Sequence, residues 1–215
     1  MTQEQKCPLC SQKAKLFYRD KTKSFECDYF LCGTCHSIFA DSAKLPNASQ
    51  EKARYELHDD NVEDKGYQKF VSPMTQAIQK EYKCSAKGLD FGAGRAPIVS
   101  KLMQDAGFNI KQYDPFFHPN AALLEEKYDY VAACEVIEHF YNPHKEFALL
   151  KRLLGEGGKL YLMSDIYDDS IDFGKWYYKN DATHVFFYTK ESFLWIQKEF
   201  GFKELRIEKR LITFC

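Results

Sequence analysis

The sequence predicts an α/β fold with a doubly wound, mostly parallel sheet and a small cysteine-rich module ahead of it. Three observations lead to this prediction. After Lys87 the chain alternates short apolar runs with helical patterns, which is typical of β-α units around a parallel sheet. A glycine-rich turn joins the first of these runs to the helix that follows. Before this region, four cysteines fall in two closely spaced pairs.

The composition indicates an ordered protein of near-neutral charge. Apolar residues make up 45% of the 215 residues and aromatic residues 16%, which is enough for a packed core. The formal net charge of −1 argues against a partner found mainly by attraction to phosphate, so nucleic acid is the less favoured partner. The polar start lacks a signal-peptide core, and no stretch is long enough to span a membrane. We therefore expect a cytoplasmic protein with reduced cysteines.

Residues 1–45 predict a zinc ribbon. The four cysteines form two C-x2-C pairs, Cys7 with Cys10 and Cys32 with Cys35. Each pair presents two thiolates from one tight turn, so two such turns complete a tetrahedral zinc site. The aromatic, alternating stretch between the pairs is typical of short strands. Cys27 and His36 are alternative ligands, and chance pairing among eight cysteines is the alternative to a metal site.

Residues 46–86 predict a polar linker with helices that cover the following domain. Ser72 followed by Pro73 fits an N-cap and a first-turn proline, so a helix is expected to begin there. Its apolar stripe consists of Met74, Ala77, Ile78 and Tyr82. The charged and aromatic segment 55–70 is interpreted as a helix and loop that lie over a pocket.

Residues 87–215 predict the sheet and its helices. Strands are expected at residues 88–91, 109–113, 128–134 and 159–163, with one or two more in the tail 202–214. Helices are expected at residues 98–106, 143–154 and 190–200, the last capped by Thr189, with Gly107, Gly155 and Gly201 ending them. The near-continuous apolar run at 128–134 is typical of a parallel strand that is buried on both faces.

The most informative segment is the turn Asp90-Phe91-Gly92-Ala93-Gly94, which follows a strand and opens a helix. Gly92 permits a tight turn, and Gly94 lets the backbone approach a ligand closely. Asp114 lies at the end of the next strand, where a carboxylate can accept hydrogen bonds from ribose hydroxyls. The pattern predicts a nucleotide-like cofactor, and a dinucleotide is the rival to the cofactor considered next.

Three motifs in this region carry a resemblance to a known family. They are the acid-led turn from Asp90 to Gly94, the strand Tyr128-Asp129-Tyr130-Val131 and the turn Leu154-Gly155-Glu156-Gly157-Gly158. Together they resemble the motifs of class I S-adenosylmethionine-dependent methyltransferases from about Lys87 to the C-terminus. The resemblance implies a Rossmann-like fold that binds S-adenosylmethionine. It also implies that Asp90, Gly92, Ala93 and Gly94 hold the methionine end of the cofactor, while Asp114 holds its ribose.

The run Cys134-Glu135-Val136-Ile137-Glu138-His139 supplies candidate catalytic and metal-binding residues at a strand end. If a helix begins there, Glu135, Glu138 and His139 share one face and can ligate a divalent cation. The motif is similar to one in ubiquinone-pathway O-methyltransferases and small-RNA 2′-O-methyltransferases. That resemblance implies a metal beside the acceptor oxygen, with His184 as a further ligand. In the alternative without a metal, Glu135 borders the methionine moiety of the cofactor.

The aromatic segment 176–188 follows the last parallel strand and contains Asp181 and His184. It suits a planar or apolar acceptor whose hydroxyl needs a base. Either His184 or His139 fits that catalytic role, because the unperturbed imidazole pKa lies near neutrality. The alternative is a core aromatic cluster that contains a hydrogen-bonded histidine.

The predicted function is methyl transfer from S-adenosylmethionine to a small hydroxylated or planar acceptor. The whole chain resembles bacterial methyltransferase-domain proteins with a four-cysteine ribbon, a resemblance that names no acceptor. Two alternatives stay open. One is an RNA-modifying methyltransferase that uses the ribbon as a reader, and the other is a non-enzymatic cofactor-binding module whose ribbon docks a protein partner.

Overall fold

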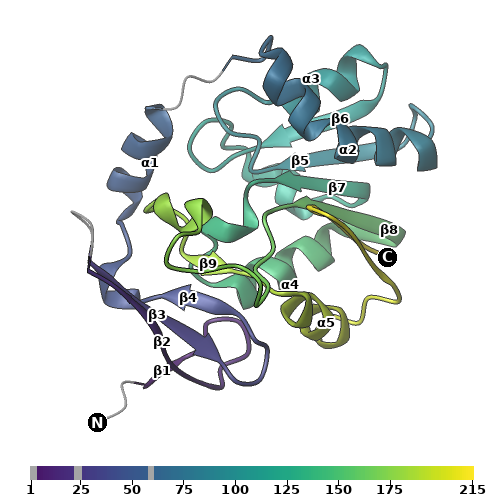
Figure 1. Ribbon diagram of the computed structural model, residues 1–215. Coiled ribbons are helices and arrows are strands. Elements are labelled where there is room, and N and C mark those ends of the chain that lie inside the picture. Colours follow the sequence, from purple (N-terminus) through teal and green to yellow (C-terminus); the bar gives the residue numbers. More distant parts are fainter. Residues whose placement is uncertain (1–3, 22–25, 58–60) are drawn as a thin grey trace.

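The computed structural model describes residues 4–21, 26–57 and 61–215, which form two β-sheets with helices around the larger one (Figure 1). Sheet A is small and antiparallel and contains the ribbon. Sheet B is mostly parallel and contains the strands predicted after Lys87. The predicted α/β class, with a ribbon ahead of a doubly wound sheet, is confirmed. Over these same ranges no helix combines the length and the hydrophobicity needed to cross a membrane.

Sheet A carries the two cysteine pairs on its turns. Its strands are β1 (Glu4–Lys6), β2 (Lys13–Asp20), β3 (Cys27–Cys32), β4 (Ile38–Ala40) and β9 (Phe186–Phe187). The first four strands are consecutive along the chain, whereas β9 comes from the C-terminal part and pairs with β4. The ribbon therefore shares a sheet with a distant segment, which the sequence pattern did not predict.

Sheet B brings ligand-binding strand ends together at its carboxyl edge. Its strands are β5 (Lys87–Phe91), β6 (Asn109–Tyr113), β7 (Tyr128–Cys134), β8 (Leu154–Met163), β10 (Leu205–Glu208) and β11 (Leu211–Phe214). Their order is β10-β11-β8-β7-β5-β6, and only the pairs that involve β11 are antiparallel. Because β6 and β7 lie on opposite sides of β5, the strand order reverses there. Such a switch point creates a crevice at the carboxyl ends of the strands.

Helices cover both faces of sheet B (Figure 1). Helices α2 (Lys65–Glu81) and α3 (Ile98–Asp105) lie on one face, and α4 (Pro143–Leu153) and α5 (Lys190–Glu199) on the other. Strand β7 shows the result: Tyr130 and Ala132 pack with α2 and α3, whereas Val131 and Ala133 pack with α4 and α5. This alternation explains the continuous apolar run of a strand that is buried on both faces.

Shorter elements complete the chain. Helix α1 (Ala48–Glu56) follows the ribbon, and single 3-10 turns form η1 (Ser42–Lys44), η2 (Ala121–Glu125), η3 (Ile137–His139) and η4 (Tyr177–Asn180). The segment 55–70, expected as a helix and loop, contains the end of α1 and the first turns of α2. Its residues 58–60 lie outside the described ranges.

The expected helix start at Ser72 and Pro73 is wrong. Helix α2 begins earlier, at Lys65. Asp64 caps it by accepting hydrogen bonds from the backbone N–H groups of Gly66 and Tyr67. Pro73 lies inside the helix, where it leaves the Lys69 carbonyl without its usual helical N–H partner. The Ser72 hydroxyl donates to that same carbonyl at 2.8 Å, so the lost hydrogen bond is replaced locally.

Strand β8 also begins earlier than predicted, at Leu154 instead of Lys159. Leu154 pairs with Tyr128, and the register then shifts so that Lys159 pairs with Tyr130. The glycine-rich residues between them bulge out of the ladder, and Gly157 has a left-handed φ of 70°. The turn seen in the sequence is thus an interruption within one strand.

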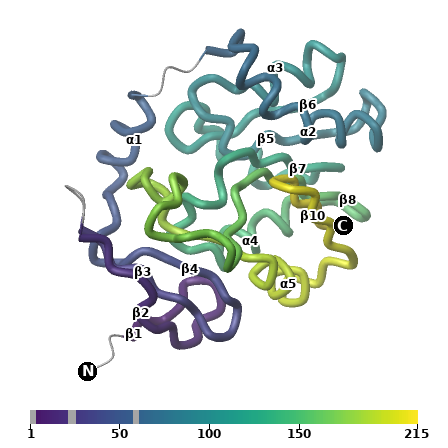
Figure 2. Tube along the Cα trace, viewed as in Figure 1, coloured from purple at the N-terminus to yellow at the C-terminus, as the bar shows by residue number. Residues whose placement is uncertain are grey.

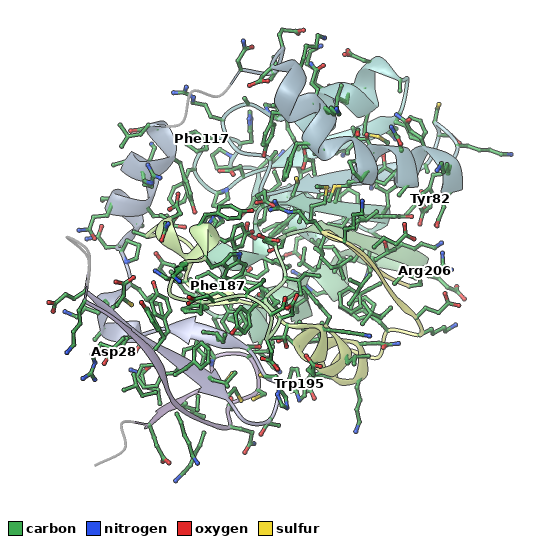
Figure 3. The ribbon with its side chains drawn as sticks, in the orientation of Figure 1. Asp28, Tyr82, Phe117, Phe187, Trp195 and Arg206 are labelled. Carbon is green, nitrogen blue, oxygen red and sulfur yellow. The ribbon has the colours of Figure 1, made fainter. Side chains whose placement is uncertain are left out.

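The segment 164–188 lies between sheet A and the carboxyl edge of sheet B (Figure 2). One hydrophobic cluster runs continuously through all three parts, from Phe30 in the ribbon through Tyr188 to Val131 in sheet B. The labelled Phe187 lies at this junction (Figure 3). The ribbon is therefore packed against the main hydrophobic core and does not form a separate core of its own.

Candidate active site

The glycine turn after β5 is held against the end of β6. The backbone N–H groups of Gly92 and Ala93 both donate to the Tyr113 carbonyl, at 2.8 and 3.0 Å. Gly92 has a φ of 76°, and a Cβ there would lie 2.6 Å from Val136 Cγ2. Gly94 has a φ of 66°, but a Cβ there would meet open space. Gly92 is thus required by packing as well as conformation, whereas Gly94 leaves room for a ligand beside the backbone.

Asp90 lies under this turn and caps the next helix. Helix α3 begins after Pro97, which supplies no side-chain cap. Instead, the Asp90 carboxylate accepts hydrogen bonds from the Ser100 backbone N–H at 3.0 Å and from the Ser100 hydroxyl at 2.8 Å. Burial raises the pKa of Asp90 to about 6. Because only 3% of Asp90 is exposed, its visible contribution is to organise the turn and the helix start.

Asp114 closes the same turn from the end of β6. One carboxylate oxygen accepts a hydrogen bond from the Gly94 N–H at 3.0 Å. The other accepts from the N–H groups of Phe116 and Phe117, at 2.8 and 3.0 Å. A carboxylate offers about four acceptor positions, so about one position is left for a ligand hydroxyl. The structure thus brings Asp114 and the glycine turn together.

No α-helix begins at Glu135, in the described segment after β7. Glu135 has a left-handed φ of 52°, which is unusual for a residue with a side chain, and the single turn η3 follows. Its carboxylate is bound by Arg210, whose Nη2 donates to both oxygens at 2.8 and 2.9 Å. Glu135 and Glu138 therefore do not share a helical face, and Glu135 is directed toward the β10–β11 turn.

Glu138 is fully buried and hydrogen-bonded. The Tyr178 hydroxyl donates to one carboxylate oxygen, and the Ser164 hydroxyl lies 3.2 Å from the other. The same Tyr178 hydroxyl lies 3.3 Å from Glu135, so it links the two acids. Burial, together with the charge of Glu135, raises the pKa of Glu138 to about 8. Near pH 7 this carboxyl consequently holds a proton unless a cation displaces it.

Two imidazoles lie side by side next to Glu138. The ring centroids of His139 and His184 are 4.8 Å apart. Nδ1 of His139 lies 2.9 Å from the Thr183 carbonyl, and Nδ1 of His184 lies 2.7 Å from the Tyr178 carbonyl. Because a carbonyl only accepts, each Nδ1 carries the proton and each neutral ring has its lone pair on Nε2. Burial lowers the pKa of His184, so this ring is neutral near pH 7.

Glu138, His139 and His184 form a candidate cation site. One potential ligand atom from each residue lies within 4.8 Å of the other two. Each imidazole is oriented by a carbonyl on its other nitrogen, as metal-ligating histidines usually are. One carboxylate and two imidazoles suit manganese, iron, cobalt or zinc better than magnesium. Glu135, the fourth ligand suggested by the sequence motif, lies outside this group.

A cavity of about 690 Å³ opens beside the cluster and includes His184 in its wall. Four aromatic side chains line it, Tyr67, Phe70, Tyr177 and Tyr178, together with the two arginines Arg54 and Arg210. Both arginines are paired, Arg210 with Glu135 and Arg54 with Asp181 at 2.9 Å. Burial would raise the pKa of Asp181, but hydrogen bonds from Thr183 and Arg54 outweigh it and hold that pKa well below its usual range. The residues of the glycine turn do not line this cavity.

In the ribbon, the four cysteine sulfurs gather at one point. Sγ of Cys7 lies 3.6 Å from Sγ of Cys35, and Sγ of Cys10 lies 3.3 Å from Sγ of Cys32. All four sulfurs lie within 4.8 Å of one another, which fits a zinc ribbon. Cys27 is outside this cluster, and its thiol instead donates to the Asp28 carbonyl.

The two cysteine turns have the same backbone geometry. The residue after each pair, Ser11 or His36, has a left-handed φ of 62° or 57°. Its N–H donates to the carbonyl of the first cysteine in the pair, at 2.9 Å in the first turn and 3.1 Å in the second. This repetition explains why His36 is exposed and apart from the sulfur cluster.

Three residues that shape the cavity were not predicted from the sequence. Arg210 follows Lys209 in the short turn between β10 and β11. In the sequence, a charged residue between two strands of the tail was the one feature that could have pointed to it. Tyr178 belongs to the predicted aromatic segment, but its link to Glu135 and Glu138 depends on tertiary packing. Arg54 comes from α1, which lies far from Asp181 along the chain.

Comparison with known proteins agrees with this arrangement. A family model described as a methyltransferase domain matches residues 53–206, a range that includes the glycine turn, Asp114 and both histidines. The chain belongs to this methyltransferase family. By this family match it is an S-adenosylmethionine-dependent methyltransferase. No curated protein matches the sequence.

Solved methyltransferase structures share the fold at low identity. A SAM-dependent methyltransferase from Archaeoglobus fulgidus is 19% identical with a TM-score of 0.53, over 66% of this chain and 72% of that one. Human N-acetylserotonin methyltransferase, in complex with SAM, is 11% identical with a TM-score of 0.54, over 77% and 56%. The mitomycin 7-O-methyltransferase MmcR is 9% identical with a TM-score of 0.50, over 67% and 53%. This chain spans little more than half of the last two proteins, and the likeness concerns the fold alone.

Proposed function

We propose that this methyltransferase methylates a hydroxyl group of a small, planar acceptor that binds in the cavity beside His184. The observation that carries the proposal is His184 in the cavity wall with His139 beside it, each imidazole having a carbonyl on Nδ1 that leaves its lone pair on Nε2. Four aromatic rings in the cavity wall suit a flat acceptor. A volume of about 690 Å³ is in the usual range for small-molecule pockets.

The residues of the glycine turn fit S-adenosylmethionine. When bound, S-adenosylmethionine supplies a methyl group that is activated by its sulfonium charge. Gly94 leaves open space beside its backbone, and Asp114 retains about one acceptor position for a ribose hydroxyl. We assign Asp90 and Ala93 to shaping the turn. We assign binding of the cofactor's methionine end to the backbone of the turn.

We assign acceptor activation to His184, with His139 as its partner. His184 is neutral near pH 7 because burial lowers its pKa, so its Nε2 can accept a proton from the acceptor hydroxyl. The Tyr178 carbonyl on Nδ1 stabilises the imidazolium that would form. Because methyl transfer is an in-line displacement, the remaining task of the protein is to position the acceptor and exclude water.

As the alternative to a histidine base, we propose a divalent cation at Glu138, His139 and His184. His184 Nε2 would then bind the cation, and the cation would activate the acceptor hydroxyl in place of the imidazole. The spacing of the three ligand atoms and the carbonyl-oriented imidazoles support this assignment. A cation there would replace the proton on Glu138 and make an adjacent acceptor hydroxyl more acidic. Glu135 is an additional ligand only if it leaves Arg210.

The ribbon cysteines are proposed to hold one structural zinc ion. Four convergent sulfurs on two equivalent turns support it. The alternative in which the ribbon reads RNA is less favoured, because β4 of the ribbon is already paired with β9 of the same chain. The family match sets aside the alternative of a non-enzymatic module.

The proposal is tested by methyl transfer from labelled S-adenosylmethionine to a panel of phenols, catechols and hydroxylated heteroaromatic rings, with RNA oligonucleotides in parallel. We expect turnover on a hydroxylated ring and a loss of about 100-fold or more in kcat for His184→Gln. The matched control is His144→Gln, which changes an exposed histidine of α4 that is paired with Glu199 of α5. Methylation of RNA alone, or an unchanged kcat in His184→Gln, would contradict the proposal.

A further inference from the structure

The ribbon and the acceptor segment are joined by continuous backbone hydrogen bonds. Strand β4 pairs with β9 through Ile38 with Phe187 and Phe39 with Phe186. The Ala40 N–H then donates to the Val185 carbonyl at 2.9 Å. The segment that carries His184 is therefore an additional strand of the ribbon sheet.

The same segment contacts the catalytic residues directly. The Val185 N–H donates to the Glu138 carbonyl at 2.9 Å. The Thr183 carbonyl accepts the Nδ1 proton of His139 at 2.9 Å. Residues 183–185 thus form hydrogen bonds with the ribbon through Val185 and with Glu138 and His139 through Thr183 and Val185.

A buried ion pair fixes the start of this segment to the ribbon. Lys179 Nζ lies 2.7 Å from a carboxylate oxygen of Asp20, at the end of β2, and the two side chains are 2% and 3% exposed. The ammonium group also lies 5.5 Å from the centre of the Tyr18 ring. Removing one charge from a buried pair takes away a close counter-charge and is strongly destabilising, so the pair constrains the backbone at Lys179.

The backbone next to Lys179 sets the orientation of His184. The preceding residue, Tyr178, accepts the Nδ1 proton of His184 on its carbonyl and donates its hydroxyl to Glu138. A displacement of the chain at Lys179 would therefore move the acceptor that defines the His184 tautomer. The route from Asp20 to the Nε2 lone pair of His184 involves one ion pair, one peptide unit and one hydrogen bond.

We propose that Asp20 and Lys179 are positioning residues for the acceptor site. On this proposal the ribbon serves to hold His184 in place and not to bind an external partner. The proposal rests on the proposed function only in treating His184 as the acceptor-side base. Its structural content is that the buried pair holds the Tyr178 carbonyl where it keeps the His184 proton on Nδ1. Among the described residues, the hydrogen bonds of the cofactor turn go to β6 and α3 and not to the pair.

The test measures the tautomer of His184 by long-range proton–nitrogen NMR at pH 8, in protein without cofactor or acceptor. His184→Gln assigns the signal. The variants are Lys179→Met, Asp20→Asn and the double variant, in which both charges of the pair are removed. The matched control is Arg19→Met, which breaks the exposed pair between Arg19 and Asp28 on the same two ribbon strands. Zinc content and the affinity for S-adenosylhomocysteine are measured on each variant.

We expect His184 to carry its proton on Nδ1 in the wild type and in Arg19→Met. In both single variants and in the double variant we expect a mixture of tautomers, with affinity for S-adenosylhomocysteine and zinc content each within twofold of wild type. The proposal is overturned if the folded variants keep the Nδ1 tautomer in full. It is also overturned if all three variants lose the whole fold, since the pair would then stabilise the protein in general.

This measurement separates the two proposals. Because it uses no acceptor, a failure to methylate any hydroxylated ring would count against the proposed function alone. Once an acceptor is known, Lys179→Met should lower kcat at least tenfold and leave KM for S-adenosylmethionine within twofold. A rise in that KM with an unchanged kcat would place the effect on the cofactor side and contradict the positioning role.

Discussion

The two halves of the site are built by different means. The cofactor half comes from one continuous stretch, residues 90–117, and most of its contacts use backbone N–H and carbonyl groups. The acceptor half brings together side chains from five separated parts of the described chain, represented by Arg54, Tyr67, Glu138, His184 and Arg210. The first half therefore depends on local backbone conformation and the second on long-range packing, so substitutions should be able to impair one and spare the other.

The largest expected separation follows from removing the ribbon metal. In a Cys7→Ser, Cys32→Ser variant we expect zinc to fall from one ion per chain to none, because the two remaining thiolates are too few for a tetrahedral zinc site. Hydroxyl methylation should be lost, since the ribbon holds the segment that carries His184. Affinity for S-adenosylhomocysteine should stay within about threefold of wild type. Metal analysis and calorimetry measure these quantities.

The control for this variant is Cys84→Ser, which changes an exposed cysteine outside the sulfur cluster. Zinc content that is low in wild type and does not fall further in the double variant would contradict the zinc assignment. An equal loss of cofactor affinity and methylation would instead remove the distinction between the two halves.

The next effect tests the cofactor half through its two glycines. Both have left-handed φ angles, but only a Cβ at position 92 would collide with Val136. Gly92→Ala is therefore expected to cost about 2–5 kcal/mol of unfolding free energy, from conformation plus overpacking. Gly94→Ala should cost about 1–2 kcal/mol, from conformation alone. Urea unfolding of the matched pair measures the difference, and equal costs would show that the contact with Val136 is relieved by movement.

The same contrast explains what could be predicted from the sequence. The glycine turn and Asp114 were identifiable because a contiguous strand-turn-helix pattern, followed by an acid at the next strand end, predicts a cofactor site. The two cysteine pairs were identifiable because C-x2-C spacing already defines half of a metal site. In both cases the residues that act together are close along the chain, and one backbone conformation brings them into contact.

The acceptor half was predicted in composition but not in arrangement. His139 and His184 were proposed as neighbours, and they lie side by side. The common helical face of Glu135 and Glu138 could not form, because Glu135 adopts a left-handed φ and pairs with Arg210 from the tail. The pairing of β4 with β9 had no local signal, since two residues of strand leave no periodic pattern to detect.

A third prediction concerns Glu138, whose pKa is raised from 4.5 to about 8 by burial and by the charge of Glu135. Between these values the folded state binds a proton that the unfolded state has released. The contribution of protonated Glu138 to the free energy of unfolding is therefore fully present below about pH 4.5 and is lost as pH rises to about 8. Over this range the free energy of unfolding falls by about 1.4 kcal/mol per pH unit. Glu138→Gln, which keeps the neutral form, should remove this part of the pH dependence.

Denaturant unfolding between pH 5 and about 8, with a metal chelator present, measures the effect of Glu138. We expect Glu138→Gln to be more stable than wild type by roughly 2–4 kcal/mol at the upper end of this range, with a smaller difference at the lower end. A difference that does not change with pH would mean that Glu138 is ionised in the folded protein. In that case the acceptor half would contain a stable carboxylate and a stronger preformed cation site.

The smallest expected effect returns to the cofactor half and concerns Asp114. Its carboxylate already accepts three backbone N–H hydrogen bonds, and about one acceptor position faces the ligand side. Asp114→Asn replaces one oxygen with an N–H₂ group, which meets either a backbone donor or the ribose hydroxyl. We expect the affinity for S-adenosylhomocysteine to fall by about 1–3 kcal/mol, as for the loss of charged hydrogen bonds. Calorimetry on wild type, the variant and the exposed control Asp105→Asn measures this loss.

The assignment of Asp114 to the ribose is sharpened by a second ligand, 5′-methylthioadenosine, which has the ribose but lacks the amino-acid end. If Asp114 binds the ribose, Asp114→Asn should weaken both ligands by the same factor. If it acts only by shaping the turn at Gly94, the loss should be larger for S-adenosylhomocysteine, because we assign the amino-acid end to that turn. Binding of NAD as tight as that of S-adenosylhomocysteine in the wild type would contradict the assignment of this half of the site.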